Sequence, residues 1–337
     1  PLPTASRPSV LQPKPMMSAP VVVEEQKAVS LYSKRIGVVF VFQKKHYPYF
    51  TVEAVLGEPD VSGEGFVGKV EKLDITRHVS GIDISDSDQE LISSLRKLQA
   101  SEINKYVSRN SPFSGIWENI IQQDDEDLPE DTRDLITEYL LPKLRKLFVE
   151  LESGWAFCLP PGKSFTTANL EPLQLQEQPA QLLLAVKKNG QYQVTARMKA
   201  GASEFSISDQ EYETPLFFVY NHQAWLWTDK EKIRMVERFR PTGKQSVSAA
   251  AWPNYLRDEL VPLARQYAIQ FDKGIMQSVK DQSPELSLYL AERNEHLIFQ
   301  PRFSYLGYEV TPADRDELIV PQGEQVLVLH RRRELEQ

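Results

Sequence analysis

The chain has 337 residues, of which 41% are hydrophobic and 26% are charged, and its mean hydropathy is −0.41. These values are ordinary for a soluble globular protein, and no apolar run approaches the roughly 18 residues that a membrane-spanning helix needs. The formal net charge of −8 opposes the binding of a polyanion by the molecule as a whole, because such binding depends on Lys and Arg displacing counterions.

The two ends of the chain and its cysteine content bear on whether it is part of a longer protein and on the compartment that it occupies. The chain opens on Pro1 without an initiator methionine and stops within a charged segment, so we expect it to be a part of a longer protein. Residues 1–30 are rich in Pro and Ser and predict a disordered or linker arm. Cys158 is the single cysteine, which excludes a disulfide within the chain and fits a cytoplasmic location.

Residues 31–152 predict a small β-meander followed by helices. Three β-branched or aromatic runs, 36–42, 49–56 and 65–73, are separated by Gly and Pro turns. Residues 86–107 have the apolar spacing of an amphipathic helix. A second helical pattern around residues 135–151 contains Pro142, which we expect to kink or split it.

Residues 153–330 predict a larger, β-rich region with a Pro-interrupted helix. Asn189-Gly190 between two apolar runs favours a two-residue type I′ hairpin, and Asn221-His222-Gln223 suggests another hairpin. A helix is expected at 252–270, with Pro253 in its first turn and Pro262 inside. Further strands are expected at 286–290, 297–301, 309–310 and 325–329.

The predicted fold class is therefore α+β, antiparallel and β-rich, with amphipathic helices and two lobes. The expected organisation is a linker arm (1–30), a small meander with helices (31–152), a larger β-rich domain (153–330) and the start of a linker to a downstream domain (331–337). Arg331-Arg332-Arg333 is expected to lie on a solvated face of that last segment.

Two segments resemble ligand motifs without meeting their requirements. Pro160-Pro161-Gly162-Lys163-Ser164 ends like a phosphate-binding loop, but position 157 is Phe where the motif needs a second glycine, so we expect a Pro-Gly turn. The acidic stretch from Asp124 to Asp131 lacks the alternating ligands and central glycine of a calcium loop, so we expect a solvated loop whose last acids favour a helix N-terminus.

Catalytic and metal-binding patterns are not recognisable. The five histidines are scattered, and one cysteine does not complete a thiolate site, so no metal ligands and no cofactor are predicted. No Gly-x-Ser-x-Gly element is present, and an enzyme of unrecognised type would need groups that only coordinates can bring together.

One constellation combines aromatic and basic residues, which is the combination that single-stranded nucleic acids use for stacking and phosphate pairing. Acidic residues are interspersed among these basic residues. The competing interpretation is therefore that the tryptophans belong to the core and that the charged segment is solvated. The candidate nucleic-acid-binding residues are Trp225, Trp227, Lys230, Lys232, Arg234, Arg238, Arg240 and Lys244.

The last part of the chain resembles a known family. Residues 286–301, Gly307-Tyr308-Glu309-Val310 and the run from Leu327 to Glu336 are similar to the segment just ahead of the motor in bacterial SNF2-family helicase-like ATPases. The blocks at 139–142, 154–162 and 182–194 are similar in order and spacing. The resemblance covers residues 31–337 and rests on the overall pattern of the sequence.

The resemblance implies an N-terminal accessory region of a DNA-stimulated ATPase whose motor lies beyond Gln337. None of the family's catalytic residues falls on this chain, so the fragment itself is expected to be non-catalytic, while its parent would be an ATP-dependent helicase or translocase. Its expected role is to position or regulate the C-terminal ATPase motor, or to contact DNA or protein partners. A free-standing single-stranded nucleic-acid or protein-binding module is the alternative.

Overall fold

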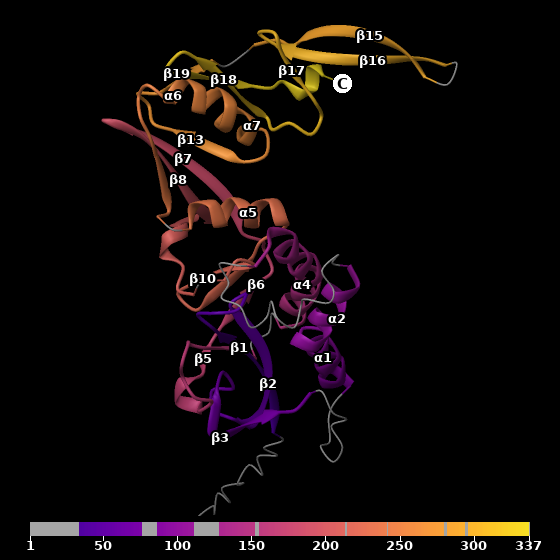
Figure 1. Ribbon diagram of the computed structural model, residues 1–337, viewed down its shortest axis with the longest axis vertical. Coiled ribbons are helices and arrows are strands. Elements are labelled where there is room, and N and C mark those ends of the chain that lie inside the picture. Colours follow the sequence, from indigo (N-terminus) through magenta and orange to yellow (C-terminus); the bar gives the residue numbers. More distant parts are fainter. Residues whose placement is uncertain are drawn as a thin grey trace, which may run out of the picture. The chain divides into compact units, whose positions relative to one another are not determined.

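The computed structural model describes residues 34–75, 86–110, 128–151, 155–212, 214–240, 242–279, 282–293 and 296–336. These residues form an α+β fold whose sheets are mostly antiparallel, as the sequence predicts (Figure 1). The expected linker arm and residues 124–127 of the acidic stretch lie outside the described residues. Among the described helices, none combines the length and the apolar character that crossing a bilayer requires.

The first sheet contains the predicted meander and two later strands. Its strands are adjacent in the order β3-β2-β1-β4-β5, and the β1–β4 pair is parallel. In chain order they are β1 (Arg35–Phe42), β2 (Phe50–Pro59), β3 (Phe66–Leu73), β4 (Ala156–Leu159) and β5 (Glu171–Pro172).

Strand β1 is a continuous apolar run because both of its faces are buried. Val38 and Phe40 belong to the main core, which also contains helix residues, whereas Val39 packs into a separate cluster on the opposite face. A strand at the centre of a sheet that is covered on both sides loses the alternation of apolar and polar residues.

Strand β4 lies beyond the domain boundary expected at residues 152–153. Because β4 pairs with β1 from Val38 to Val41, residues beyond the boundary complete the sheet that begins before it. One cluster of buried side chains continues from Ile36 to Val328. The described residues from Lys34 onward form one compact unit.

Helices α1 (Asp86–Arg96) and α2 (Ala100–Asn110) replace the single helix expected at 86–107. The chain turns between them, which lets Leu98 become buried. The Gln99 side chain donates to the Val52 carbonyl of β2 at 2.9 Å and so holds the break against the first sheet.

Helix α4 (Glu130–Glu150) continues through Pro142 as one element, so the helix is not split. Pro142 is exposed, and the hydrogen bond that it cannot make lies on the solvent side. The opposite side of α4 buries Ile136, Leu140 and Leu144 in the main core. Packing therefore holds the helix together where local propensity would interrupt it.

Two further sheets follow. The order in one is β10-β11-β6, and in the other β12-β8-β7-β13, with β9 also paired to β8. Helix α5 (Lys230–Phe239) lies between β11 and β12 in the chain. The strands are β6 (Gln174–Gln176), β7 (Gln181–Asn189), β8 (Gln191–Ala200), β9 (Ser203–Ser206), β10 (Phe217–Tyr220), β11 (Gln223–Leu226), β12 (Lys244–Val247) and β13 (Ala268–Phe271).

Both predicted hairpins are confirmed, but the turn type of the first differs from expectation. In the β7–β8 hairpin Asn189 pairs with Gln191, and only Gly190 has a positive φ, of 73°. The prediction of a two-residue type I′ turn is therefore wrong for this hairpin. In the β10–β11 hairpin Tyr220 pairs with Gln223, and Asn221 and His222 have φ of 49° and 57°. The type I′ geometry occurs at this second turn.

The helix predicted at 252–270 is shorter and irregular. It comprises α6 (Trp252–Tyr255), a π-helical turn at Leu256–Leu260 and α7 (Val261–Ala264). Pro253 lies in the first turn as expected. The π-helical turn ends two residues before Pro262, where the chain cannot donate a regular helical hydrogen bond.

The C-terminal part contains two three-stranded sheets, ordered β14-β19-β18 and β15-β16-β17. Four of these strands cover the predicted segments, while β14 and β18 were not predicted. Their bounds are β14 (Met276–Val279), β15 (Glu285–Arg293), β16 (His296–Tyr305), β17 (Tyr308–Val310), β18 (Glu317–Gln322) and β19 (Gln325–His330).

The segment after β19 corrects the expectation for Arg331. Its side chain is 1% exposed and forms an ion pair with Glu336, whose side chain is 9% exposed. The guanidinium also donates to the carbonyls of Thr311 and Asp314 at 2.9 and 2.7 Å. Arg331 is therefore a buried anchor, and only Arg332 and Arg333 have exposed side chains as expected.

Candidate functional site

The two tryptophans of the predicted nucleic-acid site lie in the core. Trp225 is 6% exposed and Trp227 is 0% exposed. The ring of Trp225 packs near Phe205 and Phe218, with centroid distances of 5.9 and 6.3 Å. Base stacking needs an accessible ring face, so these rings are placed for core packing.

Most of the predicted cations lie on α5 and face carboxylates. Lys230 pairs with Glu138 of α4 at 2.6 Å, and Arg238 pairs with Glu259 at 3.1 Å. Arg234 pairs with Asp134 and, at 3.5 Å, with Glu130. These contacts join α5 to acidic groups on neighbouring helical segments.

The other three cations are placed differently. Lys232 pairs with Asp229, the N-cap residue of α5, at 3.2 Å. Arg240 donates to the Thr214 carbonyl at 2.9 Å. Lys244 is exposed at the start of β12. The structure thus brings the basic residues together around α5, but it sets acidic partners beside most of them.

The described part of the acidic stretch has a structural role. Glu130 and Asp131 occupy the first turn of α4, where negative charge is favoured by the helix dipole. Glu130 also lies 3.5 Å from Arg234. The acidic and basic segments, which the sequence presents as separate solvated features, meet at the α4–α5 contact.

The segment that resembles a phosphate loop is a turn, as expected. Lys163 N–H donates to the Pro160 carbonyl at 3.2 Å, and Gly162 has a φ of 77°. Pro161 followed by a positive-φ glycine is the arrangement of a type II turn. A three-residue 3-10 turn, Thr167–Asn169, comes next, and not the α-helix that a phosphate loop requires.

A pocket of about 330 Å³ lies between the β1–β2 turn and α2. Apolar side chains, among them Phe50, Ile103 and Leu140, form much of its lining, and Glu53 is the acidic group. Its size and character suit a small apolar group more than a charged ligand.

The β15–β16 hairpin carries a face of exposed apolar side chains. Leu290 pairs with Phe299 and Leu288 with Pro301, and paired residues project to the same side of an antiparallel ladder. Leu288, Leu290 and Phe299 are 65%, 63% and 65% exposed. We call Leu286, Leu288, Leu290, Leu297, Phe299 and Pro301 the hairpin apolar face.

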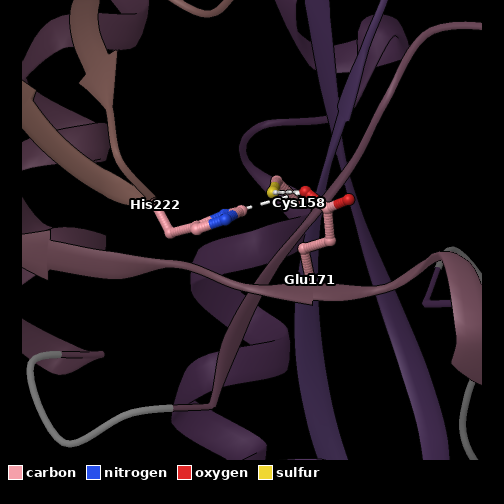
Figure 2. A group of neighbouring side chains, drawn as sticks. All are labelled: Cys158, Glu171 and His222. Carbon is pink, nitrogen blue, oxygen red and sulfur yellow. Dashed lines mark hydrogen bonds and ion pairs between the residues drawn. The ribbon is translucent and has the colours of Figure 1, made fainter.

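A second cluster combines three side chains that can ligate a metal ion. Figure 2 shows Cys158, Glu171 and His222 directed toward one another. Cys158 Sγ lies 3.8 Å from Glu171 Oε2, and His222 Nδ1 lies 3.7 Å from the same oxygen. One ligand atom from each residue lies within 4.8 Å of the other two.

The three side chains of this cluster differ in how deeply they are buried. Burial raises the pKa of the Cys158 thiol to about 12, although the Tyr212 hydroxyl at 3.8 Å opposes the shift. The side chains of Glu171 and His222 are 43% and 52% exposed. The cluster therefore has a buried sulfur at its base and two accessible ligands at its rim.

No pattern in the sequence indicates this cluster. Its members come from β4, β5 and the β10–β11 turn, so no short spacing connects them. Metal motifs are recognisable when ligands share one turn or helix, which these do not. Among the scattered histidines, only the position of His222 in a predicted turn hinted at exposure.

Comparisons with protein-family models, curated protein sequences and solved structures find no match to this chain.

Proposed function

We propose that this chain is a non-catalytic accessory region of a cytoplasmic, SNF2-type DNA-stimulated ATPase, and that it positions or regulates the motor by binding it through the hairpin apolar face. The observation that carries the proposal is the exposure of that face, where Leu286, Leu288 and Leu290 are 59%, 65% and 63% exposed. Apolar side chains exposed in a row are typical of protein-binding surfaces.

The size of the face supports a protein contact. Six side chains of this size and exposure present on the order of 600 Å², at the upper end of the largest patch on a typical monomer. Burying that area would contribute about 15 kcal/mol to the free energy of binding, before the cost of association is subtracted. Association costs about 4–15 kcal/mol, so the expected contact is reversible, which suits regulation within one polypeptide.

The family resemblance supports the identity of the partner. It is carried most strongly by residues 286–336, which include both strands of this hairpin. A motor in the same chain would be present at high effective concentration. A modest apolar surface is then sufficient to hold it.

The test uses the full-length parent with Leu290→Asp and Phe299→Asp introduced together. We expect the DNA-stimulated ATPase rate to change at least about 3-fold, since two buried charges oppose docking. An increase would identify an inhibitory contact, and a decrease an activating one.

The matched control is Ser287→Asp with Gln300→Asp, on the opposite face of the same hairpin. Circular dichroism checks that both variants fold. If the two double variants have the ATPase rate of the unmodified protein, the hairpin apolar face does not contact the motor and the proposal fails.

Direct contact with DNA is tested in a separate experiment. Fluorescence anisotropy with labelled single-stranded and duplex DNA at two salt concentrations measures it, because phosphate contacts make affinity salt-dependent. The carboxylate partners of Lys230, Arg234 and Arg238 lead us to expect weak binding. Salt-dependent binding that Arg238→Ala weakens would instead favour the nucleic-acid-binding module.

A further inference from the structure

The cluster of Cys158, Glu171 and His222 is built by strand register and turn geometry. Cys158 and Glu171 are directly opposite each other in the antiparallel β4–β5 pair. Residues directly opposite project to the same side, which brings the sulfur and the carboxylate together. Strand β6 follows β5 in the chain and pairs with β11 from Gln223, the residue after His222.

The backbone fixes the position of His222. Asn221 and His222 have φ of 49° and 57°, which non-glycine residues adopt only when the surroundings hold them. The Asn221 N–H donates to the Glu211 carboxylate at 2.6 Å. The His222 carbonyl accepts from the Gln174 N–H at 2.8 Å. The turn is therefore anchored on both of its residues.

The distances between the ligand atoms suit a tetrahedral ion. With bonds of about 2.3 Å to sulfur and 2.0–2.1 Å to nitrogen or oxygen, neighbouring ligand atoms lie about 3.4–3.6 Å apart. The two distances to Glu171 Oε2 are 3.8 and 3.7 Å. Small rotations of the accessible Glu171 and His222 side chains would close the difference.

The donor set selects the class of ion. One sulfur, one imidazole and one carboxylate form a mixed set that Zn²⁺ accepts, whereas Mg²⁺ and Ca²⁺ require oxygen ligands. The carboxylates of Glu171 and Glu211 place negative charge around the site. Binding forms a metal–sulfur bond at Cys158 and releases the thiol proton to water.

We propose that Cys158, Glu171 and His222 bind one Zn²⁺ ion, with the fourth coordination position open to water. The ion joins strands β4 and β5 of the first sheet to the β10–β11 turn of the second. This inference does not depend on the role of the hairpin apolar face, which lies on different strands.

Cobalt titration of the metal-free full chain tests the site. Co²⁺ replaces Zn²⁺ in tetrahedral sites and gives a thiolate-to-metal charge-transfer band in the near ultraviolet when cysteine is a ligand. Because Cys158 is the only cysteine, the band reports on this site alone. We expect one Co²⁺ per chain, displaced by a stoichiometric amount of Zn²⁺.

Three variants and one control sharpen the result. Cys158→Ser should abolish the band, and Glu171→Gln and His222→Ala should weaken metal binding by about 100-fold, since even outer-shell changes cost 10–100-fold. The control is His330→Ala, because His330 Nδ1 also lies 3.7 Å from a carboxylate, that of Glu317, without a cysteine. It should leave the titration unchanged.

Two outcomes would overturn the inference. The first is absence of a charge-transfer band in the unmodified chain under conditions where Zn²⁺ and Co²⁺ are in excess. The second is an unchanged affinity in both Glu171→Gln and His222→Ala. Those surface substitutions keep the test decisive even if Cys158→Ser fails to fold.

Discussion

At the scale of single residues, Arg331 shows how a charge at the edge of a sequence run can become part of the interior. The Tyr305 hydroxyl donates to Glu336 Oε1 at 2.7 Å and accepts from the Arg332 N–H at 2.7 Å. Together with the Arg331–Glu336 pair, these bonds attach the last described residues to β16. A buried pair of this kind is costly to break from one side.

Arg331→Met is expected to destabilise the protein by about 3–5 kcal/mol, because it leaves the Glu336 carboxylate buried without its partner. Arg332→Met is the control, since its pair with Glu334 is exposed and its loss should cost at most about 1 kcal/mol. Urea unfolding of both variants gives the comparison. Equal losses would show that the Arg331 network contributes little.

The Arg331–Glu336 pair also predicts that the stability of the protein falls at acidic pH. The hydrogen bond from Arg331 holds the pKa of Glu336 below its usual value. A carboxyl with a lowered folded pKa contributes stability above its unfolded pKa, about 4.3, and loses it as the pH falls through the folded pKa. Unfolding measured from pH 7 to 2 should therefore show a weaker acid dependence below pH 4.3 in Arg331→Met.

At the scale of elements, β11 and α5 decide between the two interpretations of the aromatic and basic segment. Trp225 of β11 and Trp227, which follows the strand, are both buried, and α5 pairs its cations with acidic groups. Asp229 caps the helix by accepting from the Lys232 N–H at 2.9 Å. The segment therefore has a structural explanation that needs no ligand.

Trp227→Ala is expected to destabilise the protein by about 3–5 kcal/mol, because it leaves a cavity in the main core. Lys244→Ala, at an exposed position of the same predicted site, should change stability by less than about 0.5 kcal/mol. Thermal or urea unfolding distinguishes them. A Trp227→Ala variant of unchanged stability would mean that the ring is retained for another purpose.

At the scale of the whole molecule, the parallel β1–β4 pair joins residues that are more than a hundred positions apart. Residues 34–152 alone lack β4 and β5 and leave one edge of β1 unpaired. An unpaired hydrophobic edge exposes backbone groups and favours aggregation.

A fragment of residues 34–152 is therefore expected to lack the cooperative thermal transition of the full chain and to aggregate. Circular dichroism melting and light scattering measure both properties, with the full chain as the reference. A soluble, cooperatively folding fragment would support the domain boundary that the sequence suggested at 152–153.

The sequence by itself determined the features that depend on local pattern. The meander at residues 36–73, both hairpins, the Pro-Gly turn and the α+β class follow from apolar periodicity and turn residues, which act over a few positions. Local pattern failed at the break between α1 and α2, at Pro142 and at the Asn189-Gly190 turn. At the first two, packing against the core overrides propensity.

Only the tertiary structure decided which side chains meet. The parallel addition of β4, the burial of Arg331, the pairing of α5 with α4 and the meeting of Cys158, Glu171 and His222 all join segments that are distant in sequence. Their physical reason is shared. Contacts between distant segments depend on the register of strands and the packing of faces, and a single sequence does not encode either in its local spacing.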